Sequence, residues 1–109
     1  PQSLVDASPF HGSMIITDVG SLRIGPIFHH IYNFGTLPVF IAFGSKRHAY
    51  EIDRHGQVVD HKYVDCKFVM DERTVDGHYY AQFLQAIRYL FQHPEILEAP
   101  PTKVVEDVY

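Results

Sequence analysis

One stretch decides the fold of this chain: His48-Ala-Tyr-Glu-Ile-Asp-Arg-His-Gly-Gln-Val-Val-Asp-His-Lys-Tyr-Val-Asp-Cys-Lys-Phe-Val-Met70. In its last third, apolar residues alternate with polar ones from Tyr63 to Met70. A period of two with one apolar face predicts a half-buried β-strand with a fixed register. Cys66 is therefore expected to point into the core, and His61 and Asp65 are expected to share the opposite face.

A tight turn is predicted in the middle of this stretch, at Asp53-Arg54-His55-Gly56. Aspartate favours the opening position of such a turn, and glycine supplies the positive φ that hairpin loops of three or four residues need. With this turn we expect Ile52 to pair with Gln57. The same register would place His48 opposite His61.

Further strands are predicted upstream of the hairpin. Met14–Val19 is short and β-branched and ends at Gly20, which favours a strand. Leu37–Phe43 is apolar on both faces, which is typical of a strand covered on both sides, either by its own domain or by a partner chain. A turn over residues 44–47 is expected to separate it from a strand over His48–Ile52.

The segment between these strands has two interpretations. After Pro26, apolar residues and His30 recur at helical spacing as far as Phe34, which favours a short helix near residues 26–34. A strand through residues 28–32 is the alternative.

The clearest helix is predicted over residues 77–92. Apolar side chains fill one half of its helical wheel, and Asp76 fits as the N-cap, accepting the backbone N–H of Tyr79. His93-Pro94 ends the helix. The apolar arc spans about 180°, wider than the roughly 100° that seats a helix on one sheet, so a second contact is expected.

These elements predict an α+β fold of two layers, in which an antiparallel β-meander of about four strands is covered by the long C-terminal helix. One domain is expected over residues 14–98, between an irregular N-terminal arm over residues 1–13 and an extended or frayed tail over residues 99–109. His11-Gly12-Ser13-Met14 is typical of a cloning junction, so the arm is either left from cloning or native.

Composition excludes several classes of protein. The 109 residues are enough for one domain, and a single Cys excludes an internal disulfide. The net charge of −4 argues against nucleic-acid binding, which needs clustered Lys and Arg. No apolar run approaches the roughly 20 residues of a membrane span. We therefore expect a soluble, cytoplasmic protein that binds neither nucleic acid nor membrane.

Histidine is the unusual residue, with eight among 109. Protonation of all eight would move the net charge from −4 to +4 by about pH 5, given an ordinary imidazole pKa near 6.5. This excess predicts assembly or solubility that is sensitive to acid.

Three residues form a candidate metal site: His48, His61 and Asp65. In the expected register the two imidazoles are cross-strand neighbours, about 5 Å apart at Cβ, and could supply part of a divalent-metal site. The chain would then be a metal-binding protein or a small histidine-dependent enzyme. The spacing matches no established zinc motif, and a slip of one residue would put the rings on opposite faces. A solvated polar sheet face is the competing interpretation.

A protein-interaction surface is the leading functional hypothesis. The two-sided apolar strand, the wide apolar arc of the helix and the seven Tyr all point to a partner contact. We expect a small non-catalytic interaction or assembly module without a cofactor, whose partner is a second copy in a homodimer. The expected interface residues are Leu37, Val39, Phe40, Ile41, Tyr80, Leu84 and Phe91.

Overall fold

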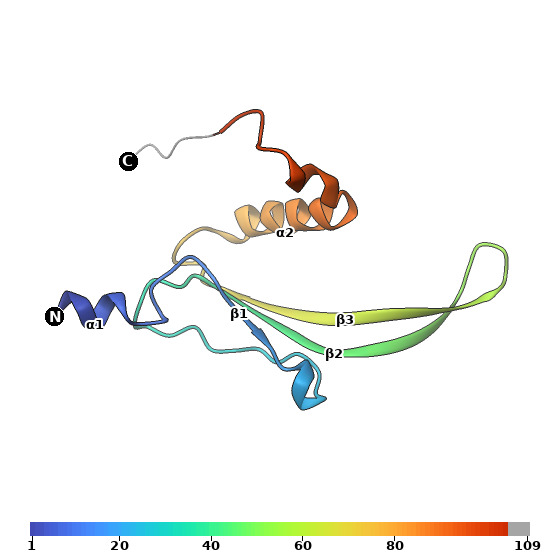
Figure 1. Ribbon diagram of the computed structural model, residues 1–109, viewed down its shortest axis with the longest axis horizontal. Helices are drawn as coiled ribbons and strands as arrows, with labels where there is room; N and C mark the ends of the chain where they lie inside the picture. Colours follow the sequence, from blue (N-terminus) through green and yellow to red (C-terminus); the bar gives the residue numbers. More distant parts are fainter. Residues whose placement is uncertain (105–109) are drawn as a thin grey trace. The chain divides into compact units, whose positions relative to one another are not determined.

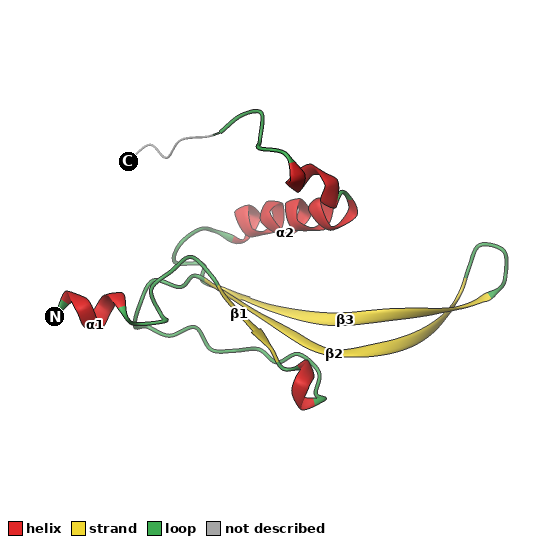
Figure 2. Cartoon of the chain, in the orientation of Figure 1, coloured by secondary structure: helices red, strands yellow, loops and turns green. Residues whose placement is uncertain are grey.

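The computed structural model describes residues 1–104 and is a mixed α+β structure with a three-stranded sheet and one main helix (Figures 1 and 2). The elements are, in chain order, α1 (Gln2–Asp6), β1 (Ile15–Asp18), η1 (Gly20–Leu22), β2 (Val39–Ile52), β3 (Val58–Met70), α2 (Gly77–Gln92) and η2 (Pro94–Glu98). The chain divides into two compact units, Pro1–Thr74 and a second that begins at Val75. That the sheet is covered by the helix, and that residues 14–98 form one domain, stay predictions.

The hairpin of β2 and β3 is closed by hydrogen bonds around Asp53. Its carboxylate oxygen Oδ1 accepts the backbone N–H of His55 at 2.7 Å and that of Gln57 at 2.9 Å. The Asp53 N–H donates to the carbonyl of Gln57 at 2.8 Å, and Gly56 has φ +76°. The loop therefore has three residues between a closing Asp53–Gln57 pair, with glycine in the left-handed position.

This closing pair sets an antiparallel register one residue away from the expected one. Ile52 pairs with Val58, and His48 pairs with Lys62. The predicted pairing of His48 with His61 is wrong, because it assumed a loop of four residues.

Strand β2 is continuous through residues 44–47, where a turn was expected. Phe43 pairs with Cys66 and the next pair is Lys46 with Val64, so β2 carries one extra residue there. Such a β-bulge bends a strand without ending it. The sheet consequently has three strands in place of the expected four.

Strand β1 pairs with β2 in parallel, from Ile15 opposite Phe40 to Asp18 opposite Phe43. The expectation of an antiparallel meander is wrong at this strand. Parallel neighbours need a crossover connection of a dozen or more residues, and residues 19–38 supply it.

The crossover contains neither the helix expected near residues 26–34 nor the alternative strand. It contacts the sheet through side chains instead. The His29 ring stacks on Phe40 with centroids 4.3 Å apart, and its Nε2 lies 2.9 Å from Thr17 Oγ1. Lys67 Nζ lies 4.5 Å from the ring centroid of Phe28. These tertiary contacts outweigh the helical preference that the spacing of apolar residues indicated.

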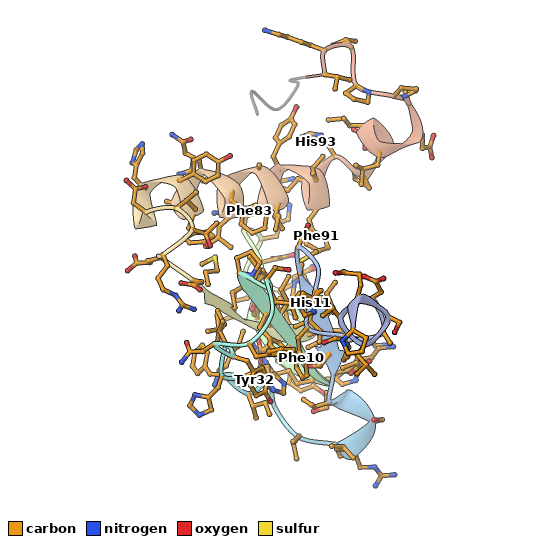
Figure 3. The ribbon with its side chains drawn as sticks, turned by 90° about the vertical axis from the view of Figure 1, so that its left-hand side faces the viewer. Phe10, His11, Tyr32, Phe83, Phe91 and His93 are labelled. Atoms are coloured by element: carbon orange, nitrogen blue, oxygen red, sulfur yellow. The ribbon has the colours of Figure 1, made fainter. Side chains whose placement is uncertain are left out.

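Residues 1–13, where an irregular arm was expected, include the short helix α1. Beyond it, the Phe10 ring lies edge-on to Tyr32 with centroids 4.9 Å apart (Figure 3). The Phe10 carbonyl accepts the N–H of Thr36 at 2.9 Å, and the Gly12 N–H donates to Thr36 Oγ1 at 3.0 Å. The end of the arm is therefore packed against the last part of the crossover.

Few apolar side chains are buried. Among those described, they are Tyr80 in the second unit and, in the first, Val19, Val39, Phe40, Ile41 and Ala42. Cys66 was expected to join them but is exposed. The period of two is correct, since Cys66 shares its face with Phe68 and Met70, both half-buried. The side chains of this face become more exposed toward the hairpin turn, and Cys66 already belongs to the exposed part.

Helix α2 begins and ends where the sequence predicts. Asp76 is the N-cap, and its Oδ1 accepts the N–H of Tyr79 at 3.0 Å. The His93 N–H closes the last turn on the Tyr89 carbonyl at 2.9 Å, and Pro94 then begins η2. Of the extended tail expected over residues 99–109, the part beyond residue 104 lies outside the described residues. No helix within residues 1–104 has the length and hydropathy needed to cross a bilayer.

A substitution at Gly44 tests the close contact between the crossover and the bulge. A Cβ at Gly44 would meet the backbone nitrogen of Pro26 at 2.6 Å, whereas a Cβ at Gly25 would meet nothing within 4 Å. We expect Gly44→Ala to lower the free energy of unfolding by about 1–3 kcal/mol, because backbone cannot move aside as a side chain does. Gly25→Ala is the matched control and should be neutral. Urea unfolding followed by circular dichroism measures both, and equal effects would contradict the predicted contact.

Asp76 tests the start of α2. Asp76→Ala should destabilise the helix by about 1 kcal/mol, since it removes the acceptor for the Tyr79 N–H. Asp76→Asn keeps a capping oxygen and should stay close to the unsubstituted chain. Thermal melts at 222 nm compare the two variants, and an equally large loss in both would show that the negative charge matters more than the cap.

Candidate functional site

The three residues of the expected metal site do not meet in the structure. His48 pairs with Lys62 and His61 pairs with Ala49, so the two imidazoles lie on opposite faces of the hairpin. Asp65 shares the face of His61 but not that of His48. Within the part of the chain that the structure describes, no group of three or more His, Cys, Asp and Glu side chains could hold a metal ion.

Each histidine has a local contact instead. His48 Nδ1 lies 3.0 Å from both carboxylate oxygens of Asp60, its diagonal neighbour on β3. The ring of His61 lies 6.0 Å from the ring of Tyr63, on the other face. Both contacts are on the exposed surface, which agrees with the interpretation of these histidines as part of a solvated sheet.

The distinctive feature of the molecule is the far part of this hairpin. Strand β1 pairs with Phe40–Phe43, so beyond the bulge the described part of the sheet consists of two strands (Figure 1). We call residues 46–52 and 58–64 the ribbon. Both of its faces carry exposed side chains. A two-stranded hairpin alone is at best marginally stable in water, so contacts with further strands or side chains would stabilise this segment.

One face of the ribbon, here the apolar face, presents four exposed apolar side chains, in rows that also contain Lys46, His48, Asp60 and Lys62. The exposed fractions are 75% for Tyr50, 75% for Ile52, 69% for Val58 and 43% for Val64. The register sets Ile52 beside Val58 near the turn and Tyr50 in the next row. Large apolar side chains grouped on a polar surface mark an interaction site more often than scattered ones do.

The opposite face, here the polar face, is organised by hydrogen bonds. The Arg47 guanidinium donates to both oxygens of Asp65, from Nε at 2.6 Å and from Nη2 at 3.0 Å. The Tyr63 hydroxyl donates to Glu51 Oε1 at 2.8 Å, and Arg47 Cζ lies 5.1 Å from the Tyr63 ring centroid. These diagonal pairs join β2 to β3 and fix the rotamers of this face.

The polar contacts shift the protonation of their members. Hydrogen bonds from Arg47 lower the pKa of Asp65, and the same bonds raise the pKa of Arg47. The hydrogen bond to Glu51 raises the pKa of Tyr63. Asp65, Arg47 and Tyr63 are therefore held in their ordinary charge states at neutral pH, which suits a structural role better than proton transfer.

Cys66 has the chemistry of an unreactive thiol. Partial burial raises its pKa, and the negative charge of Asp65 raises it further. The thiolate is the nucleophile, so a raised pKa makes this sulfur a poor one. Exposure alone does not make Cys66 a catalytic residue.

The seven residues of the expected interface have very different environments. Four are buried within the chain: Val39, Phe40, Ile41 and Tyr80. Two are half-buried: Leu37 and Leu84. Phe91 alone is strongly exposed, at 76%. Tyr50, Ile52 and Val58 were not among the expected interface residues, but their side chains are far more exposed than the six buried or half-buried ones. Their every-second-residue spacing on either side of the turn places them on one face once the register is known.

Arg47 and Asp65 give a test of the polar face. Arg47→Gln removes both hydrogen bonds to Asp65, so the pKa of the Asp65 carboxyl should rise toward its ordinary value near 3.9. A carboxyl with a lowered pKa stabilises the fold above its ordinary pKa, and this contribution is lost as pH falls through the folded-state value. Carbon-detected NMR titration of the side-chain carboxyl measures the change. Lys46→Gln, one residue earlier and on the other face, should leave Asp65 unchanged.

Comparison with known proteins adds no family to this description. The sequence matches no protein-family model, and no curated protein is significantly similar to it.

Proposed function

We propose that the chain is a non-catalytic interaction module that forms a homodimer through its ribbon. The observation that carries the proposal is a two-stranded segment exposed on both faces, with four exposed apolar side chains on one of them. Such a segment has little to stabilise it within its own chain. Contact with a second copy would supply the missing neighbours.

Burial of apolar side chains would stabilise this contact, as it does in the core of other interfaces. Fully burying a Val or Ile side chain contributes about 1.5–3 kcal/mol, and a symmetric contact counts each residue twice. Val58, which lies on the outer strand β3, can therefore offset part of the cost of association, which is roughly 4–15 kcal/mol, when it packs against a second copy.

The alternative of a metal-binding protein or histidine-dependent enzyme has less support. It requires His48, His61 and Asp65 on one face, and the register separates His48 from the other two. The cytoplasmic location expected from the sequence is a separate proposal, and a homodimer is compatible with it. Phe91, exposed on α2, stays a candidate for an additional contact.

Sedimentation equilibrium tests the proposal directly. We expect the chain to be a dimer in the micromolar range, and Val58→Lys to weaken the association by about tenfold or more, because a charged side chain would replace an apolar one at the contact. Leu22→Lys, at an equally exposed apolar residue on η1, is the matched control and should leave the dimer intact. A monomer at all concentrations up to about 100 µM, well above typical dimer constants, would overturn the proposal.

A further inference from the structure

The outer edge of β3 has no strand paired with it within residues 1–104, because the strand order of the sheet is β1-β2-β3. The closing pair Asp53–Gln57 makes the odd-numbered residues of β3 the ones whose backbone groups face β2 in the ribbon. By alternation, the N–H and C=O groups of the even-numbered residues from 58 to 64 face outward. An edge of this kind is a template for another strand.

A second copy of β3 is the simplest strand to fill this edge. Two identical antiparallel strands in one sheet are related by a two-fold axis perpendicular to the sheet, which passes between the two copies of one residue, so that this residue faces its own copy. Registers centred on Asp60, Lys62, Asp65 or Lys67 would place like charges face to face, which is unfavourable. Registers centred on Tyr63 or Val64 would set Asp60 against an uncharged thiol or an aromatic ring.

We propose that β3 pairs with β3 of a second copy in the register centred on His61. Asp60 then faces Lys62 of the second copy, and by symmetry Lys62 faces the second copy's Asp60. Val58 faces Val64 of the second copy, again twice. Opposite charges and apolar side chains are thus matched on one face, in rows that continue those of the ribbon.

The other face is matched as well. Val59 would face Tyr63 of the second copy, which extends the packing around the Arg47 guanidinium. His61 would face its own copy on the axis, in a pair whose backbone groups do not bond each other. The outward-facing backbone groups of the even-numbered residues would form the ladder between the two copies. Each ribbon would then be part of a four-stranded sheet.

One other register, centred on Cys66, also pairs opposite charges, by setting Asp65 against Lys67. In the His61 register Asp60 contacts His48, and Lys62 has no ion pair among the described residues. Both charges of the Cys66 register, in contrast, already have partners, since Arg47 binds Asp65 and Lys67 lies over the Phe28 ring. In addition, the Cys66 register overlaps residues 62–70 and leaves the turn end of the ribbon unpaired. The His61 register covers residues 57–65, which are the residues in need of a neighbour.

This inference rests on the proposed homodimer and is tested by disulfide trapping. The chain has one Cys, so Cys66→Ser gives a thiol-free background. In it, His61→Cys should form a covalent dimer on mild oxidation, because a directly opposed pair has Cα atoms about 4.5–5.5 Å apart, within disulfide range. Tyr63→Cys in the same background is the control. Its two copies would be four residues apart along the strand, about 13 Å, and should not cross-link.

A charge swap gives a second test that needs no oxidation. Asp60→Lys and Lys62→Asp should each weaken the dimer by about tenfold or more, because each faces like charges against each other twice. The double variant Asp60→Lys/Lys62→Asp restores opposite charges and should recover most of the affinity. Far-UV circular dichroism checks that every variant is folded.

The outcomes separate the register from the dimer itself. A dimer by sedimentation that is trapped by native Cys66, and not by His61→Cys, would overturn the His61 register in favour of the one centred on Cys66. A dimer that neither thiol traps, and that the charge swap leaves unchanged, would show that the ribbon faces and not the edges make contact. A monomeric chain would overturn the proposed function together with this inference.

Discussion

The hydrogen bonds of one carboxylate determine the arrangement of the hairpin. Asp53 accepts two backbone N–H groups and thereby closes the loop with three residues, not four. That single residue of difference decides which side chain faces which over the whole length of β2 and β3. It separates His48 from His61, groups the exposed apolar side chains on one face, and turns the even-numbered backbone groups of the ribbon outward.

The bulge at Gly44 divides this hairpin into two parts with different roles. Before it, β2 is buried from Val39 to Ala42 and is flanked by β1, β3 and the crossover. After it, the same strand is polar and largely exposed. The extra residue in β2 changes which of its side chains share a face. Odd-numbered residues of β2 before the bulge and even-numbered ones after it therefore lie on the same face as the even-numbered residues of β3. The buried part holds the chain together and frees the ribbon for contact.

Local signals in the sequence predicted local structure well. The cap at Asp76 and the stop at His93 depend on nearest neighbours, and both were found where expected. The strand pattern of β3 was also correct. The predictions that failed depended on contacts between distant residues. The register depends on the length of the hairpin loop, and the parallel pairing of β1 depends on the path of the crossover. The residues near His29 form no helix, and the His29 ring stacks on Phe40 instead. Part of the candidate site followed from the sequence, namely the face shared by His61 and Asp65, whereas the exposure of Ile52 and Val58 did not.

The parallel pairing of β1 also orders the folding of the chain. The β2–β3 hairpin needs only a three-residue loop and can form in about 1–10 µs, as hairpins do. Strand β1 lies earlier in the sequence but has no edge to pair with until β2 exists, and residues 19–38 must close around it. We therefore expect the first strand of the chain to be the last to join the sheet, and the hairpin, with its open outer edge, to form before the core is complete.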